Sequence, residues 1–317
     1  MVYAFLKITA RIALQFYCRK IIINKNDFLQ LNGPLLIAAN HPNSFLDAII
    51  LATIFKHPVY SLTRGDAFAN KLYTLILRQM NMLPVYRLSE GAENLENNYS
   101  TFTACQHIFT ENGIVLIFSE GRCINEWHLR PLKKGTARLA MSAWQQNIPL
   151  KVLPVGINYS CFRKFGKIVI LNFGKVIMAK DFDNDSFAGK AVINFTSKLN
   201  EQLKQLVFEI GINDKERMKK EFYVHQSLLK TTLLFIPAIA GWLLHFPLYY
   251  TIVFLIRKKA QDHYDSILVG LLFILYPFYL AAITLITFYL TKNLLSFLLI
   301  IIIPFTAWAK LQLKKQG

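Results

Sequence analysis

Hydrophobic positions divide the chain into three parts with different patterns. Between residues 27 and 225, short apolar runs alternate with longer stretches in which apolar residues recur at helical spacing. Short runs rich in β-branched and aromatic residues are typical of buried strands, and the longer periodic stretches are typical of helices. The pattern predicts strands at residues 35–39, 59–63, 82–86, 114–118, 150–157 and 168–173, and helices at 44–55, 69–80, 92–111, 135–146 and 187–211.

Strands that alternate with helices predict an α/β domain over residues 27–225, with a central mixed sheet flanked by helices. In open sheets of this type, ligands bind where the strands end and the loops begin. We therefore expect an active site among the residues that directly follow the predicted strands.

The first part, residues 1–26, is apolar with regularly spaced polar side chains. Lys7, Arg11, Gln15 and Arg19 recur at every fourth position, so on a helix they form one polar stripe among apolar residues. This pattern favours a helix that lies in the membrane interface over one that spans the membrane. The alternative is a helix packed on the following domain. A secretory signal is disfavoured because the charges lie inside the apolar run.

The third part, residues 226–317, is dominated by apolar runs at 229–256, 267–290 and 294–308, which predict membrane helices. Cations mark the ends of the runs, and the positive-inside rule assigns these cations to the cytoplasmic side. We expect two hairpins, the first broken near His245 and Pro247 and the second formed by the two later runs. A single straight helix over 229–256 is the alternative.

Composition supports a membrane protein. The chain has 317 residues, is 54% hydrophobic and carries a formal net charge of +17. Anionic membrane surfaces and nucleic acids are the usual partners of such basic chains, and the apolar C-terminal runs favour the membrane over nucleic acid. The four cysteines are scattered, which suggests neither a zinc site nor a disulfide framework. The glycine pattern matches neither a Walker loop nor a dinucleotide fingerprint, so we expect no nucleotide cofactor.

A histidine and an aspartate, His41 and Asp47, follow the first predicted strand of the domain. An imidazole oriented by a carboxylate can act as a general base that takes a proton from a hydroxyl group. No serine of the protein is needed, because a substrate could bring the hydroxyl. The alternative is a surface turn in which Asp47 caps the next helix.

Cations suited to holding phosphate follow two further strands. Arg87 ends the strand at 82–86, and Arg122 and Lys133 come after the strand at 114–118. Arginine binds phosphate through a bidentate fork, and the start of a helix adds backbone N–H groups. A single cation of this kind is more often a solvated surface residue. The set, together with the histidine and the aspartate, indicates a shared site.

Four ordered motifs resemble those of the glycerophospholipid acyltransferases, which include 1-acylglycerol-3-phosphate and glycerol-3-phosphate acyltransferases. The resemblance covers roughly residues 35–175. The motifs are Asn40-His41 with Asp47, Leu83-Pro84-Val85-Tyr86-Arg87, Phe118-Ser119-Glu120-Gly121-Arg122 and Val152-Leu153-Pro154-Val155. Two departures stand out. Five residues separate His41 from Asp47, one more than the common family spacing, and in the third motif Ser119 replaces a proline while the threonine before the arginine is missing.

The resemblance implies that His41 is the general base and that Asp47 orients it. It also implies that Arg87 and Arg122 bind the phosphate of the acceptor and that Glu120 and Gly121 shape the acceptor pocket. The substrate-binding residues that we predict are Asn40, Arg87, Glu120, Gly121, Arg122 and Lys133.

The resemblance further implies the reaction. We expect a fatty acyl group to move from a thioester, acyl-CoA or acyl-carrier protein, to the hydroxyl of 1-acylglycerol-3-phosphate or a related glycerol-phosphate lipid, in phospholipid biosynthesis and without a metal. The basic flanks place the site at the cytoplasmic face of an inner membrane. The alternatives are acylation of another lysolipid or an amino-lipid, or a catalytically inactive lipid-binding membrane protein.

Overall fold

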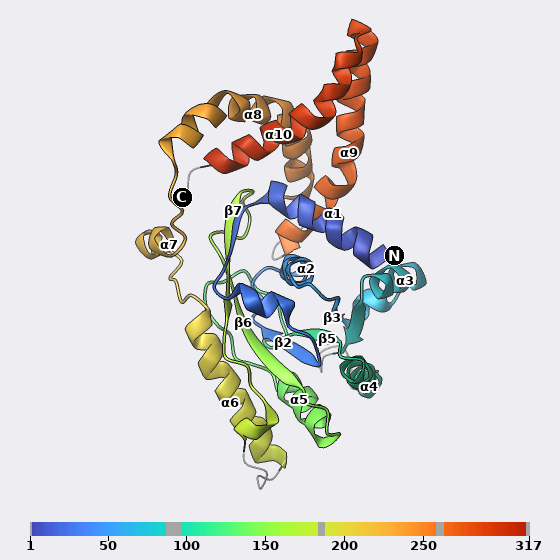
Figure 1. The fold of residues 1–317 in the computed structure, drawn as a ribbon, viewed down its shortest axis with the longest axis vertical. Coiled ribbons are helices and arrows are strands. Elements are labelled where there is room, and N and C mark those ends of the chain that lie inside the picture. The colour runs from blue at the N-terminus through green and yellow to red at the C-terminus, as the bar shows by residue number, and fades with distance from the viewer. Residues whose placement is uncertain (1, 87–96, 183–187, 258–262, 315–317) are drawn as a thin grey trace.

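A seven-stranded mixed sheet forms the centre of the protein (Figure 1). The computed structural model describes residues 2–86, 97–182, 188–257 and 263–314. The strand order is β1-β7-β6-β2-β5-β3-β4, and only β6 and β7 pair antiparallel. The strands are β1 (Cys18–Ile23), β2 (Leu35–Ala39), β3 (Val59–Arg64), β4 (Met82–Val85), β5 (Ile114–Phe118), β6 (Lys151–Tyr159) and β7 (Lys167–Phe173). The predicted fold class is confirmed.

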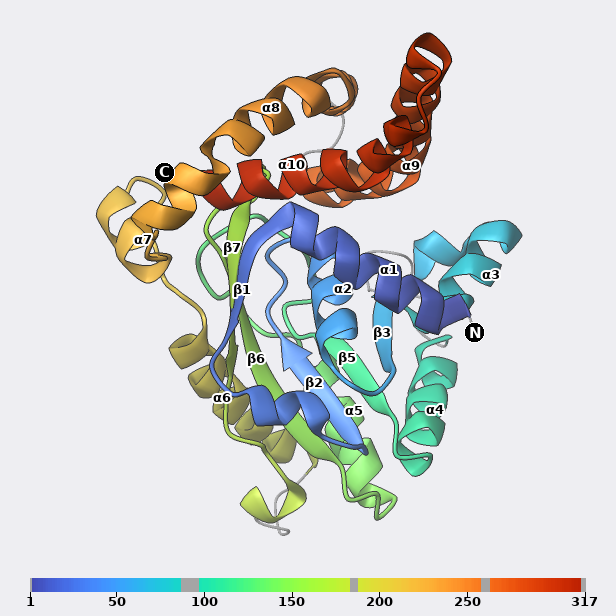
Figure 2. The ribbon, with the colours of Figure 1, turned by 45° about the horizontal axis from the view of Figure 1, so that its top comes forward.

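Helices cover both faces of the sheet. The helices of the domain are α2 (Phe45–Ile54), α3 (Lys71–Gln79), α4 (Asn97–Thr110), α5 (Gly135–Gln145), α6 (Ala188–Leu206) and α7 (Lys215–Glu221). Figure 2 shows α2 in front of the sheet and α5 and α6 behind it. The side chains of β2 point alternately to these two faces, and all of them are apolar. Leu35, Ile37 and Ala39 pack into the core on the α2 side, while Leu36 and Ala38 pack among α4, α5 and α6.

The first helix, α1 (Val2–Tyr17), ends earlier than the sequence pattern predicts. Residues 18–23 form the edge strand β1, which pairs parallel with β7. The helical prediction is wrong here because the run of three isoleucines at 21–23 favours a strand once a partner strand is available. That partner lies far along the chain, so the local pattern does not reveal it.

The cationic stripe of α1 faces the protein. The Lys7 ammonium donates to the carbonyl of Phe55, and the Arg11 guanidinium donates to the carbonyl of Thr53 at 2.7 Å. Both acceptors lie at the end of α2, where unpaired carbonyls and the helix dipole attract cations. Phe5 and Ile8 on the other side of α1 are 64% and 61% exposed. The helix therefore packs on the domain through these charges and through the buried Leu14 and Tyr17, and it leaves Phe5 and Ile8 outside.

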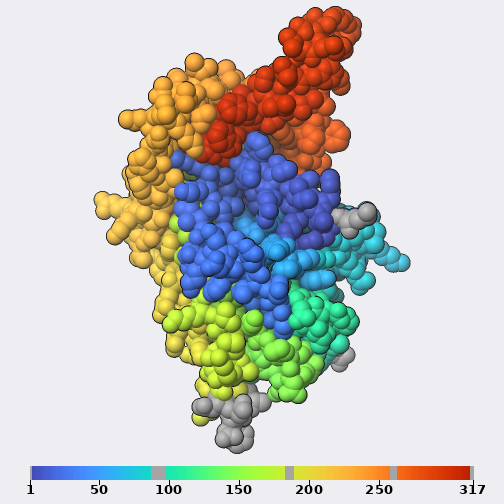
Figure 3. Space-filling model, viewed as in Figure 1, coloured from blue at the N-terminus to red at the C-terminus, as the bar shows by residue number. Residues whose placement is uncertain are grey.

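Three helices near the C-terminus are long and apolar enough to cross a membrane. They are α8 (Leu228–Ile256), α9 (Tyr264–Thr291) and a segment, Leu294–Leu313, that contains α10 (Leu299–Leu313). In Figure 3, α10 lies directly against the N-terminal segment of the chain. The second predicted hairpin corresponds to α9 and this last segment.

The predicted break near His245 and Pro247 is wrong, because α8 is one continuous helix. Two side chains form hydrogen bonds with backbone carbonyls close to Pro247. The Tyr279 hydroxyl on α9 donates to the carbonyl of Leu244 at 2.6 Å, and Nδ1 of His245 lies 2.8 Å from the carbonyl of Gly241. Prolines are tolerated inside membrane helices, and the Tyr279 bond ties the turn before Pro247 to α9.

Both ends of α8 nevertheless lie beside the α/β domain. Near its start, the Lys230 ammonium donates to the Gln312 side chain at the end of α10. Near its end, Ile252 and Ile256 are buried in the same core cluster as β2. The helix curves between these two points, as Figures 1 and 2 show. Lys314, at the end of α10 beside Gln312, contacts the carbonyl of Phe165 in the domain. Lys230 and Arg257, the described cations at the two ends of α8, therefore lie on the domain side.

We predict that Gly241→Ala destabilises the packing of α8 on α10. A Cβ atom at Gly241 would lie 2.1 Å from the backbone carbonyl oxygen of Thr306 on α10, so the two helices would have to separate. Overpacking of this kind costs about 1–3 kcal/mol. Each kcal/mol corresponds to a fall of roughly 2–4 °C in Tm for a protein of this size class.

The measurement is thermal unfolding of the full chain in detergent. Gly270→Ala on α9 is the matched control, because a Cβ atom added at Gly270 would meet no other group within 4 Å. Equal Tm values for the two variants would contradict the close contact between α8 and α10.

Candidate active site

The sheet register brings the candidate residues together. Strand β2 pairs parallel with both β5 and β6, so the segments that follow β2 and β5 leave the same edge of the sheet. Ala39 is opposite Phe118, and the backbone N–H of Ser119 donates to the carbonyl of Ala39 at 2.8 Å. The loop with His41 and the loop with Glu120 are consequently neighbours, as the shared site requires.

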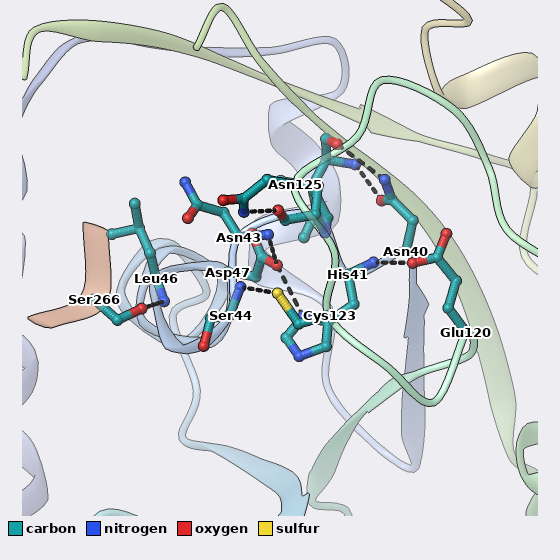
Figure 4. Close-up of polar contacts among 12 residues, drawn as sticks. Asn40, His41, Asn43, Ser44, Leu46, Asp47, Glu120, Cys123, Asn125 and Ser266 are labelled. Atoms are coloured by element: carbon teal, nitrogen blue, oxygen red, sulfur yellow. Dashed lines mark hydrogen bonds and ion pairs between the residues drawn. The ribbon is translucent and has the colours of Figure 1, made fainter. Parts of the chain in front are cut away.

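The histidine and the aspartate form a dyad despite the longer spacing (Figure 4). Nδ1 of His41 lies 2.9 Å from Oδ2 of Asp47. The aspartate is fully buried and accepts two further hydrogen bonds, from the backbone N–H of Asn43 at 2.8 Å and from the Tyr159 hydroxyl at 2.7 Å. Burial and the nearby Asp47 charge raise the pKa of Tyr159 well above its ordinary value, so its hydroxyl keeps the proton that it donates.

The imidazole has one nitrogen left for a substrate. A carboxylate only accepts hydrogen bonds, so Nδ1 of His41 carries the proton that faces Asp47 and Nε2 presents a lone pair. The ring stacks on Phe118 with centroids 3.8 Å apart and planes inclined by 9°. The His41 side chain is 17% exposed, whereas Asp47 has no exposure. This arrangement suits proton abstraction from a hydroxyl group that approaches Nε2.

Glu120 is buried and holds two loops in place. Its Oε2 accepts the backbone N–H of His41 at 2.8 Å, and its Oε1 accepts the backbone N–H of Arg130 at 2.9 Å. Burial raises the pKa of Glu120, while the two backbone N–H groups oppose that rise. The carboxylate thus fixes the main chain at the base of the dyad.

Asn40 is committed to the sheet. Its Nδ2 donates to the carbonyl of Ile157 at 3.0 Å, and its Oδ1 accepts the N–H of the same residue at 2.7 Å. The side chain is 2% exposed. Both ends of the amide therefore bind the β6 backbone, and the structure gives Asn40 a part in orienting the loop.

Two of the predicted cationic residues, Arg122 and Lys133, lie at the surface. Gly121 has a φ of +66°, and a Cβ atom there would lie 2.9 Å from Cγ of Lys133, so the turn requires glycine. The backbone N–H of Lys133 donates to the carbonyl of Ser119 at 2.7 Å, which places Lys133 beside the turn. Arg122 and Lys133 are exposed. Arg87 lies outside the described residues.

Several residues of the site were not predicted from the sequence. Tyr159 lies just beyond the predicted strand at 150–157, because β6 continues to Tyr159. Asn43 lies in the loop between the histidine and the aspartate, and the sequence pattern does not indicate its contact with Asp47. The Sγ atom of Cys123 accepts the backbone N–H of Ser44 at 2.8 Å. A tyrosine at the end of a buried strand was a usable signal, whereas the cysteine contact depends on the folded loop.

Comparisons with known proteins bear on the chemistry. Residues 20–158 match the family model described as Acyltransferase. Among solved structures, the chain is similar to the 1-acyl-sn-glycerophosphate acyltransferase PlsC from Thermotoga maritima, with 11% sequence identity and a TM-score of 0.45. That match covers 71% of this chain and 81% of the other. No curated protein sequence matches the chain.

We predict that Asn40→Ala lowers the stability of the domain. The substitution leaves the buried N–H and carbonyl of Ile157 without partners, which costs about 1–3 kcal/mol per unsatisfied group. Thermal unfolding of the full chain measures the effect. Asn213→Ala, at an exposed position, is the control. If the two variants had the same Tm, the assignment of Asn40 to the fold would be incorrect.

Proposed function

We propose that this chain, whose residues 20–158 match the acyltransferase family model, is an enzyme that acylates the hydroxyl group of 1-acylglycerol-3-phosphate or a related glycerol-phosphate lipid. The acyl donor in this proposal is a thioester, either acyl-CoA or acyl-carrier protein. The observation that carries the proposal is the contact between Nδ1 of His41 and the buried Asp47, which leaves Nε2 directed away from the carboxylate.

His41 acts as the general base in the proposed mechanism. Nε2 takes the proton of the acceptor hydroxyl while the hydroxyl oxygen attacks the thioester carbonyl carbon. The carbon–sulfur bond then breaks, and the departing thiolate takes the proton back from the imidazolium as a thiol. Asp47 keeps the imidazole in the required tautomer and stabilises its transient positive charge. A positioned base contributes about 10²–10⁴-fold to the rate of such a step.

The cations beside the dyad would hold the phosphate of the acceptor. Arg122 and Lys133 are exposed next to the Gly121 turn, which directly follows Glu120, and Glu120 is bonded to the backbone of His41. A phosphate bound there would keep the acceptor hydroxyl within reach of Nε2, and orientation of this kind can contribute more than the base itself. Arg87 is proposed as a further phosphate ligand.

The apolar C-terminal helices support a membrane location. We place the enzyme in an inner membrane with its active site on the cytoplasmic side, where both thioester donors occur. Lys314 at the end of α10 contacts the domain at Phe165, and Lys230 at the start of α8 bonds Gln312 beside it, as the positive-inside rule expects of a cytoplasmic domain. Lipids of that membrane supply the acceptor in this proposal.

We predict that His41→Ala and Asp47→Asn abolish most of the acyl transfer. His41→Ala removes the base, and Asp47→Asn permits the wrong tautomer of His41, so we expect kcat to fall about 10²–10⁴-fold for each. The assay offers long-chain acyl-CoA and acyl-carrier protein with 1-acylglycerol-3-phosphate and glycerol-3-phosphate to the purified full chain. Thermal unfolding confirms that each variant folds. Transfer by a folded His41→Ala variant at the wild-type rate would refute the mechanism.

We also predict that Arg122→Ala and Lys133→Ala weaken use of phosphate-bearing acceptors. Each removes a charge-assisted hydrogen bond of about 1.5–3 kcal/mol, so kcat/KM for the acceptor should fall roughly tenfold to a hundredfold. The comparison acceptor is a lysolipid without a phosphomonoester, for which little change is expected. Arg138→Ala, at an exposed position on α5, is the control. A wild-type preference for the acceptor without a phosphomonoester would redirect the assignment to another lysolipid.

A further inference from the structure

A buried carboxylate at the start of α9 reaches the loop of the dyad. Asp265 is the second residue of α9 and has no exposed surface. Its Oδ1 accepts the Tyr17 hydroxyl at 2.5 Å, and its Oδ2 accepts Nδ2 of Asn43 at 2.7 Å. Asp265 also forms an ion pair with Lys167, which is equally buried. Burial of an ionisable residue in an apolar helix costs free energy, and such residues usually have a functional role.

Asn43 connects Asp265 to the dyad. Its backbone N–H donates to Oδ2 of Asp47, the same oxygen that faces Nδ1 of His41. Its side chain is 1% exposed, and its Oδ1 has no hydrogen-bond partner among the described residues. Because a carboxylate only accepts, Asp265 requires the amide to present its NH₂ group. One residue therefore bonds Asp47 with its main chain and Asp265 with its side chain.

The first turn of α9 also caps the first turn of α2. The backbone N–H of Leu46, one of the unpaired donors at the start of α2, donates to the Ser266 hydroxyl at 3.3 Å. The Ser44 side chain makes no capping bond to its own helix and instead lies 2.6 Å from Nδ1 of His263. The segment that carries the dyad is thus held from outside by the beginning of α9.

The charge arrangement allows this contact to persist in the interior. Lys167 on β7 balances Asp265, and Tyr17 and Asn43 occupy both of its oxygens. A buried ion pair is favoured by filling its remaining hydrogen-bonding capacity; the Asp265 oxygens meet this condition, whereas the Lys167 ammonium makes no hydrogen bond among the described residues. The four side chains come from α1, the dyad loop, β7 and α9, so the contact forms only when α9 is seated on the domain.

We propose that Asp265 is a positioning residue for the proposed acyl transfer, acting through Asn43 on the His41–Asp47 dyad. The inference rests on the proposed function, since it assigns α9 a part in that same site. The start of an apolar C-terminal helix becomes part of the catalytic machinery. Loss of the contact releases the dyad loop and affects the chemical step more than the binding of either substrate.

The test exchanges the two partners. Asn43→Asp places two carboxylates in contact and Asp265→Asn weakens the acceptor, so we expect kcat to fall roughly tenfold or more in each, with KM for both substrates changed less than about twofold. The combination Asn43→Asp with Asp265→Asn restores one donor and one acceptor between the two positions, although it removes the carboxylate that pairs with Lys167. We expect kcat of the combined variant to lie clearly above the product of the single losses, because the hydrogen bond between the two positions is restored while the ion pair with Lys167 is not.

Two controls distinguish the positioning role of Asp265 from a general loss of folding or stability. Thr284→Val alters another buried polar side chain on α9, remote in sequence from the dyad contact, and should leave kcat unchanged. If Asn43→Asp does not fold, Asn43→Ala replaces it and must still lower kcat. Single variants with kcat within about twofold of the wild type, or a combined variant no better than the product of its parts, would overturn the role of Asp265.

Failure of the proposed function gives a different result. In that case the wild type transfers no acyl group to any offered acceptor, or His41→Ala remains as active as the wild type. If the wild type is active and depends on His41 while the Asn43 and Asp265 variants behave normally, only the positioning role is wrong.

Discussion

The burial of Asp47 is the constraint on which the candidate site depends. A carboxylate removed from water is tolerated only when hydrogen-bond donors replace its hydration. Asp47 receives three donors, from His41, the Asn43 backbone and the Tyr159 hydroxyl. These donors belong to the loop after β2 and to the end of β6. The contact that would prepare His41 for the proposed proton transfer is therefore the same contact that fixes this loop against the sheet.

The order of the strands supplies those donors. Because β2 lies between β5 and β6, the residues after β5 support the loop from one side and β6 supports it from the other. Glu120 holds the His41 backbone, and Asn40 binds Ile157 of β6. Exchange of strand positions would separate these groups, whatever the local sequence of each loop. The position of β2 between β5 and β6 is thus a requirement of the site as well as a framework for the core.

Local patterns predicted most of the α/β domain, and the exceptions share one physical cause. Strands β2 and β5 were predicted with their observed bounds because each is a fully apolar run that ends in a polar turn. The helix predicted over the first part, residues 1–26, was wrong after Tyr17, since pairing with β7 overrides the local pattern. The dyad was found because both members lie close together in sequence, directly after one strand. Asp265 was missed because its partners come from distant segments, although a lone acid at the start of an apolar helix was a usable signal.

The position of α9 bears on how a lipid could reach the dyad. In the proposed reaction the acceptor keeps its acyl chain in the bilayer while its hydroxyl must meet Nε2 of His41. The first turn of α9 contacts the dyad loop, so a membrane entered by α9 would begin close to that loop. The apolar outer side of α1 is exposed on the same face of the sheet as α9. Because the dyad is anchored to the start of a membrane helix, the acceptor lipid needs to move only a short way out of the bilayer to reach His41. The short displacement limits the exposure of the lipid's acyl chain to water.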